Sequence, residues 1–224
     1  MTPTNRDELR KIYDARFGGN IVYRRKVWQV LVRDFFQNYV STDARVLDLG
    51  CGYGEFINAI ECREKFGMDL NPDAPTHLNP AVKFFEQDCS LRWQLDDVSL
   101  DVVFTSNFFE HLPDKAALGR TLDEIFRCLA PGGILIAMGP NLRYLPGAYW
   151  DFWDHHVALT DKSLGEGLSS RGFQILESIP KFLPYTMVNQ REYPMAILRF
   201  YLQIPIGWRI FGGQFLLVAK KPHE

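Results

Sequence analysis

The stretch VLDLGCGYGEF at residues 46–56 combines an apolar run with glycines at the alternate positions 50, 52 and 54. Apolar residues that end in closely spaced glycines, followed by Glu55 and Phe56, predict a buried strand, a tight loop and the start of a helix. Because glycine has no Cβ, a ligand can lie directly against this loop, and the free N–H groups at the helix start would receive an anionic group. The loop is therefore the predicted ligand site.

Two classes of protein place a glycine-rich turn after the first strand, and the glycine spacing separates them. Dinucleotide-binding proteins have the pattern G-x-G-x-x-G. Counted from Gly50, that pattern requires a glycine where this chain has Glu55, whereas Gly54 gives the spacing G-x-G-x-G. Asp48, two residues before the first glycine, would repel a pyrophosphate but could hold an ammonium group or position water. A cationic ligand is therefore favoured over a dinucleotide.

The run Asp48-Leu49-Gly50-Cys51-Gly52-Tyr53-Gly54 resembles the first motif, D-x-G-x-G-x-G, of the class I S-adenosylmethionine-dependent methyltransferases. The resemblance extends over residues 44–178. It implies an α/β fold with a Rossmann-like seven-stranded sheet, strand order 3-2-1-4-5-7-6, whose last strand is antiparallel and whose faces carry helices. It also implies an enzyme that uses S-adenosyl-L-methionine, forms S-adenosyl-L-homocysteine, and binds the cofactor through Asp48, Gly50, Cys51, Gly52 and Gly54.

Acidic residues end the next two predicted strands. Residues 65–70 predict the second strand, where Asp69 could accept both hydroxyls of a ribose or, alternatively, cap the following turn. Residues 82–88 predict the third strand. By resemblance to the family, Asp69 contacts the ribose of the cofactor, and Asp88 with Cys89 contacts its adenine. Leu70 and Asn107 complete the predicted cofactor site, with Asn107 at the methionine end.

The remaining strands and helices follow from apolar runs and capping residues. Residues 100–107 form an unbroken, β-branched run, which predicts a central parallel strand beside the first one. Asp114 and Thr160 predict helix N-caps. Residues 134–138, 173–179 and 215–219 predict the last three strands, and the three prolines of residues 72–80 predict a loop in place of a crossover helix.

Composition predicts one globular domain. The chain has 224 residues, 46% of them apolar, and a formal net charge of −2, which argues against nucleic acid as a partner. Its four cysteines form no C-x-x-C pair, so neither a metal site nor a disulfide framework is expected. The N-terminus lacks an apolar signal core, so a cytoplasmic location is expected. The predicted parts are a helical cap (1–40), the cofactor-binding core (44–178), an insertion (180–212) and the last strand (213–221).

The predicted N-terminal cap consists of two helices. Residues 5–17 are polar and favour a helix, which the glycines near residue 18 end. Apolar residues recur every four positions between Val22 and Tyr39, which predicts an amphipathic helix over an edge of the sheet. In the resembling family such helices often close over the cofactor. The candidates for contact with the carboxylate of the cofactor or with the substrate are thus Tyr13, Arg16, Tyr23 and Arg24. The alternative is that these four are ordinary surface residues.

An aromatic segment at residues 149–156 predicts the acceptor pocket, with an aromatic plug on the core as the alternative. An acceptor hydroxyl must lose its proton, and the pKa of histidine lies nearest to operating pH. His156 is the first candidate for this base, His111 the second and His155 the third. Asp151 or Asp154 could orient an imidazole. The alternative is that these are ordinary hydrogen-bonded histidines, because an acidic acceptor needs no base.

The family usually joins its last two strands by a tight hairpin, but here more than thirty residues intervene. Met195–Leu202 and Ile204–Phe211 are apolar runs broken by Pro205, which are too short and polar for a membrane span. The segment is a substrate lid, an interfacial segment or a dimer contact. Because Arg191, Arg199 and Arg209 accompany the apolar residues, residues 195–211 are expected to contact a membrane surface or an amphiphilic acceptor, with a dimer interface as the alternative.

The predicted reaction is transfer of a methyl group to an acceptor hydroxyl. The element His156-Val157-Ala158-Leu159-Thr160 and the long insertion resemble bacterial relatives that act on glycans or natural-product precursors, which favours a sugar-like hydroxyl. The second hypothesis is a quinone, a lipid or a small aromatic metabolite as acceptor. A third is a regulatory protein that binds S-adenosylmethionine without turnover.

Overall fold

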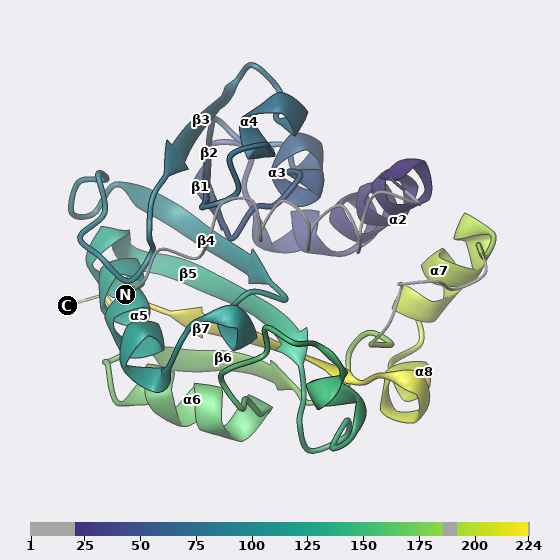
Figure 1. The fold of residues 1–224 in the computed structure, drawn as a ribbon. Coiled ribbons are helices and arrows are strands. Elements are labelled where there is room, and N and C mark those ends of the chain that lie inside the picture. Colours follow the sequence, from purple (N-terminus) through teal and green to yellow (C-terminus); the bar gives the residue numbers. More distant parts are fainter. Residues whose placement is uncertain (1–20, 186–191, 224) are drawn as a thin grey trace.

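The computed structural model describes residues 21–185 and 192–223, and its centre is one seven-stranded sheet (Figure 1). The strand order is β3-β2-β1-β4-β5-β7-β6, and only β7 runs antiparallel to its neighbours. The predicted order is therefore confirmed. The strands are β1 (Arg45–Leu49), β2 (Glu64–Asp69), β3 (Val82–Glu86), β4 (Leu100–Ser106), β5 (Leu129–Pro140), β6 (Gln174–Ile179) and β7 (Gln214–Lys220).

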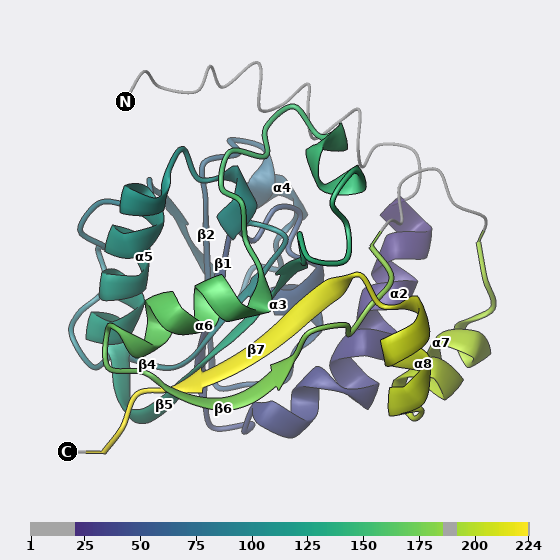
Figure 2. The same cartoon turned by 90° about the horizontal axis from the view of Figure 1, so that it is seen from below.

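Helices cover both faces of the sheet, as Figure 2 shows, with α5 and α6 on one side and α2 on the other. The helices are α2 (Ile21–Asp34), α3 (Glu55–Ala59), α4 (Ala74–His77), α5 (Lys115–Cys128), α6 (Asp161–Ser169), α7 (Met195–Leu202) and α8 (Pro205–Phe211), with short 3-10 turns η1 (Phe36–Tyr39), η2 (Phe109–His111) and η3 (Ala148–Asp151). Alternate residues of one strand enter opposite layers. Val103 packs with α5 and α6, whereas Val102 and Phe104 pack with α2 and α3.

Helix α2 lies over the central strands and not over an edge of the sheet, which corrects the prediction. Trp28 and Phe36 both pack edge-on against Phe104 of the central strand β4, with ring centroids 6.0 and 5.1 Å apart. Phe56 of α3 stacks on the same ring at 3.6 Å. Periodicity identified the apolar face of the helix, but it contains no information about which strands that face meets. Residues 1–20, including the predicted contacts Tyr13 and Arg16, lie outside the described residues, as does Arg191.

Local capping explains where two helices begin. The Asp114 side chain accepts a hydrogen bond from the Ala117 N–H at 2.7 Å, which caps α5. Thr160 and Ser163 form a reciprocal capping box at the start of α6. Both predicted caps are confirmed. The proline-rich segment after β2 contains one helical turn, α4, instead of a loop without structure.

The insertion before β7 folds as the two short helices α7 and α8. Both lie at one margin of the molecule, beside α2 (Figures 1 and 2). Within the described ranges, no helix is both long and apolar enough to cross a bilayer.

Candidate active site

The glycine loop after β1 adopts a left-handed backbone at each of its three glycines. The φ angles are 71° at Gly50, 52° at Gly52 and 72° at Gly54. At Gly50 space is also restricted, because a Cβ there would lie 2.8 Å from the Phe108 Cβ and closer still to the Phe108 ring. The Gly50 N–H donates to the Met68 carbonyl at 2.8 Å, so the loop is bonded to the neighbouring strand β2. Contact with Phe108 and the hydrogen bond to Met68 thus fix the conformation of the loop.

Asp69 at the end of β2 holds this loop. Its Oδ2 accepts from the Gly52 N–H and its Oδ1 from the Asn71 N–H, both at 2.8 Å, and the side chain is buried. The turn-capping alternative is therefore present in the structure. The ribose role of Asp69 stays a prediction. Neither Asp69 nor the exposed Leu70 lines the cavity described next.

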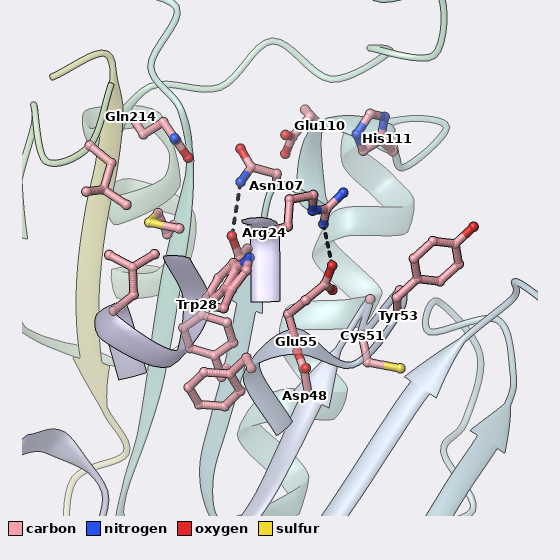
Figure 3. Close-up of a pocket in the computed structure, with 18 of the residues that line it drawn as sticks. Arg24, Trp28, Asp48, Cys51, Tyr53, Glu55, Asn107, Glu110, His111 and Gln214 are labelled. Atoms are coloured by element: carbon pink, nitrogen blue, oxygen red, sulfur yellow. Dashed lines mark hydrogen bonds and ion pairs between the residues drawn. The ribbon is translucent and has the colours of Figure 1, made fainter. Parts of the chain in front are cut away.

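A cavity opens beside the glycine loop, between α2, the end of β4 and the aromatic segment (Figure 3). Its lining includes the predicted residues Asp48, Gly50, Cys51, Gly52, Asn107, His111 and His155. It includes Phe152 of the predicted aromatic segment, and also residues that were not predicted for the site, among them Trp28, Glu55, Glu110, Tyr185 and Gln214. Most of these come from segments far apart in the chain, so no local pattern could connect them.

The loop end of the cavity is acidic. Asp48 is buried, and this burial, together with the charges of Glu55 and Asp69, raises the pKa of its carboxyl well above the usual range. Buried acids that repel one another favour a positively charged ligand, which would relieve both the repulsion and the burial cost. Arg24 of α2, one of the predicted contacts, lines the same cavity and forms an ion pair with Glu55 at 2.9 Å (Figure 3). The arrangement suits a ligand that carries both a cation and a carboxylate.

The opposite end of the cavity is a polar corner formed by Glu110, His111 and His155. Their ligand atoms lie within 4.8 Å of one another, so among the described residues this group could hold a metal ion. His111 Nδ1 lies 3.0 Å from the Asp154 backbone carbonyl and 3.1 Å from its carboxylate. Both partners accept, so Nδ1 carries the proton and Nε2 is left as the basic nitrogen. Burial lowers the pKa of His111, but the bond to Asp154 and the charge of Glu110 outweigh burial and raise it above 6.5.

Whereas His111 and His155 line the cavity, His156, the first candidate for the base, lies outside it. Its side chain is exposed, and its backbone N–H donates to the Glu110 carbonyl at 2.8 Å. His155 is buried in the cavity wall instead, with its ring 4.8 Å from that of His111. The segment also forms the predicted aromatic plug in part, since Tyr149 is fully buried and its hydroxyl donates to the Val157 carbonyl.

The predicted adenine residues lie away from this cavity. Asp88 Oδ1 accepts from both the backbone N–H and the hydroxyl of Ser90, each at 2.8 Å, and Cys89 is buried beside Thr121. Their adenine role stays a prediction. Asn107, by contrast, lines the cavity with a φ of 50° and donates from its amide to the Ser106 hydroxyl at 3.0 Å.

Comparison with known proteins gives a family match and several relatives. Residues 22–178 match a family model described as a methyltransferase domain. The chain is 29% identical to a probable S-adenosylmethionine-dependent methyltransferase of Mycolicibacterium smegmatis over 169 residues, covering 72% of this chain and 60% of the relative. It is 26% identical to 2-methyl-6-phytyl-1,4-hydroquinone methyltransferase of Synechocystis, covering 75% of this chain and 57% of the relative. It thus spans less than two thirds of the length of either protein.

Two further similarities extend over almost the whole chain. Demethylmenaquinone methyltransferase of Leptospira interrogans is 25% identical, with 98% of this chain and 92% of the relative covered. The crystal structure of a SAM-dependent methyltransferase from Archaeoglobus fulgidus superposes with a TM-score of 0.67 at 20% identity, covering 95% of this chain and 99% of the other. At that identity, the structural match shows a common fold.

Proposed function

Since this chain belongs to the class I S-adenosylmethionine-dependent methyltransferase family, we propose that it transfers a methyl group from that cofactor to an oxygen of a small acceptor. One observation carries the proposal. A single cavity joins the acidic glycine loop, with Asp48 and Glu55, to a corner that contains His111. The first end suits a cationic donor, and the second can take up the proton that an acceptor hydroxyl must lose.

The residues present fit S-adenosylmethionine, because the loop end of the cavity offers carboxylates for its positive charges and Arg24 for its carboxylate. When bound, the cofactor supplies a methyl group already activated by a positively charged sulfur. Asp48 and Glu55 would hold the cationic end, while the glycine loop, kept in place by Asp69, would support the rest. We propose that Asp69, Leu70, Asp88 and Cys89 hold the adenosine part.

The cavity lining favours a hydroxylated aromatic acceptor, such as a quinol, over a sugar. Trp28, Phe152 and Tyr185 line the cavity, and the rings of Phe152 and Tyr185 lie 5.9 Å apart, edge to face. Aromatic walls bind flat apolar rings by burial and stacking, whereas a sugar requires many polar partners. The names of two relatives, a hydroquinone and a demethylmenaquinone methyltransferase, agree with this choice. A sugar-like hydroxyl is therefore the second hypothesis.

In the proposed reaction, His111 is the general base. Asp154 fixes the tautomer in which Nε2 is unprotonated, so this nitrogen can accept the proton of the acceptor hydroxyl as the oxygen takes the methyl group. The surrounding residues exclude water and align the acceptor, and alignment alone can contribute roughly 7 to 11 kcal/mol in favourable models.

Calorimetry tests the cofactor assignment directly. We expect the protein to bind S-adenosylmethionine and S-adenosylhomocysteine but neither NAD nor FAD. Asp48→Asn keeps the shape of the side chain but cannot become the carboxylate that a cationic ligand pairs with. Because a charge-assisted hydrogen bond contributes about 1.5 to 3 kcal/mol, the substitution should weaken S-adenosylmethionine binding at least about tenfold. Asp43→Asn, an exposed position before β1, is the matched control and should bind normally. Binding of NAD as tight as that of S-adenosylmethionine would overturn the assignment.

A further inference from the structure

Helices α7 and α8 carry five large apolar side chains that are exposed to solvent. The exposed fractions are 55% for Ile197, 66% for Phe200 and Ile206, 63% for Ile210 and 67% for Phe211. Helix α8 contains no buried residue at all. These five side chains are named the insertion patch. Exposed apolar side chains that occur singly are ordinary, but five on two adjoining helices mark an interaction surface.

The helices that carry the patch are fixed to the body of the protein by their other side. Leu202 is buried, and the Tyr201 hydroxyl donates to the Phe182 carbonyl at 2.6 Å. The Trp208 ring packs edge-on against Phe182 at 5.2 Å, and its Nε1–H donates to the Tyr201 carbonyl at 2.9 Å. Arg199 also pairs with Asp34 of α2 at 3.3 Å. Leu202, Tyr201 and Trp208 thus hold the helices against the body of the protein, while the insertion patch faces solvent.

The charges around the patch are mainly basic. Between residues 192 and 212 the sequence has one acid, Glu192, and two arginines, Arg199 and Arg209. Arg199 is paired with Asp34 of α2, whereas Lys181 adds a basic group next to the patch, because its Nζ donates to the Ile210 carbonyl at 3.3 Å. A second copy of the chain on this patch would bring Arg209 and Lys181 of the two copies to the same apolar face. An anionic lipid surface offers phosphates to the basic side chains and an apolar interior to the patch.

The insertion also begins and ends at the wall of the cavity. Leu183 and Tyr185, near the start of the insertion, line the cavity, and Gln214 lines it just after the insertion ends. The two ends are bonded to each other, since the Leu183 carbonyl accepts from the N–H groups of Gly213 and Gln214 at 2.8 and 2.9 Å. The insertion that carries the patch is therefore joined to the cavity wall at both ends.

We infer that the insertion patch docks on an anionic lipid bilayer, and that the acceptor is a lipophilic compound dissolved in that bilayer. The docking stands on the patch and its charges, whereas the nature of the acceptor rests on the proposed function. Docking requires no spanning helix: the apolar side chains enter the region between headgroups and acyl chains while the arginines stay among the phosphates.

Vesicle flotation with the full-length protein tests the docking. The protein should float with vesicles of 70% phosphatidylcholine and 30% phosphatidylglycerol at low salt, and less with phosphatidylcholine alone. Because each buried apolar side chain contributes about 1.5 to 3 kcal/mol, Ile210→Glu with Phe211→Glu should lower partitioning at least about tenfold. Arg209→Gln should lower it about fivefold on the anionic vesicles. Leu91→Glu, at an equally exposed apolar residue after the edge strand β3, is the control and should float normally.

Two results would overturn the inference. One is a wild-type protein that stays with the unbound fraction on anionic vesicles. The other is a wild-type dimer in light scattering that the Ile210→Glu, Phe211→Glu variant converts to a monomer, which would make the patch a contact between copies. Circular dichroism and S-adenosylmethionine calorimetry on the same variant show whether it is folded. Absence of cofactor binding in the wild type would remove the proposed function but leave the flotation result standing.

Discussion

His111→Ala should slow methyl transfer by about 100- to 10,000-fold, the usual contribution of a positioned general base. The Nε2 atom of His111 is the nitrogen that Asp154 leaves unprotonated, and it belongs to the corner of the cavity opposite the glycine loop. Alanine removes the proton acceptor without touching the acidic end of the cavity. The measurement is a single-turnover assay with labelled cofactor and a short-chain quinol, and cofactor affinity should stay within about threefold of wild type.

The pH dependence of this reaction has a definite sign. The pKa of His111 is raised above 6.5, because the bond to Asp154 and the charge of Glu110 outweigh the effect of burial. The base is active only when neutral, so the rate should fall as the pH drops through this raised value. Asp154→Asn should move the acid limb of the profile to lower pH, because a neutral amide stabilises the imidazolium less.

Two controls separate a base from other roles. His156→Ala removes an exposed neighbour that lies outside the cavity and should change the rate less than about threefold. A chelator should leave the wild-type rate unchanged. A loss of less than tenfold for His111→Ala would show that alignment alone drives the reaction, and a rate abolished by the chelator would make Glu110, His111 and His155 a metal centre.

Gly50→Ala should destabilise the protein by about 2 to 5 kcal/mol. A left-handed backbone costs an alanine roughly 1 to 2 kcal/mol, and forcing an extra carbon into a filled space costs about 1 to 3 kcal/mol. Both penalties apply, because Gly50 has a φ of 71° and its missing Cβ would collide with Phe108. Urea unfolding without ligand measures the change in the free energy of unfolding.

The matched control is Gly147→Ala at the start of η3. Its φ is −88°, and no atom lies within 4 Å of the position that a Cβ would take. We expect a change of no more than about 0.5 kcal/mol there. If both variants unfold at the same urea concentration, the glycine loop and Phe108 do not pack as described.

The sequence contained most of the fold because the features that specify it are local. The apolar run before Gly50, the central strand at residues 100–106, and the caps Asp114 and Thr160 each act within a few residues of themselves. The order of the strands came from the resemblance carried by the glycine motif. Where the local pattern was weaker, the predicted helix boundary was wrong. The helix predicted to reach Tyr39 ends at Asp34, and a separate 3-10 turn follows it.

The site was less predictable because its residues meet only in the folded chain. The sequence cannot tell His155 from its neighbour His156; the side chains diverge because the backbone of residue 156 is bonded to Glu110. Glu110 itself is an acid between a phenylalanine and a histidine directly after the central strand, which was a usable signal. Tyr185 and Gln214 gave none, since the insertion separates them in the chain.

Helix α2 has a consequence for how ligands enter and leave. It covers the cavity with Arg24, Trp28 and Leu31, but five of its side chains are buried: Val27, Trp28, Val30, Leu31 and Val32. Swinging the helix away would expose them at about 1.5 to 3 kcal/mol each, so the open form would be present in fewer than about one molecule in 100,000. Ligands therefore enter and leave at another part of the cavity mouth, where the side chains of Phe152 and Tyr185 are only half-buried and can rotate. Exchange then requires rotation of these side chains and no movement of the scaffold.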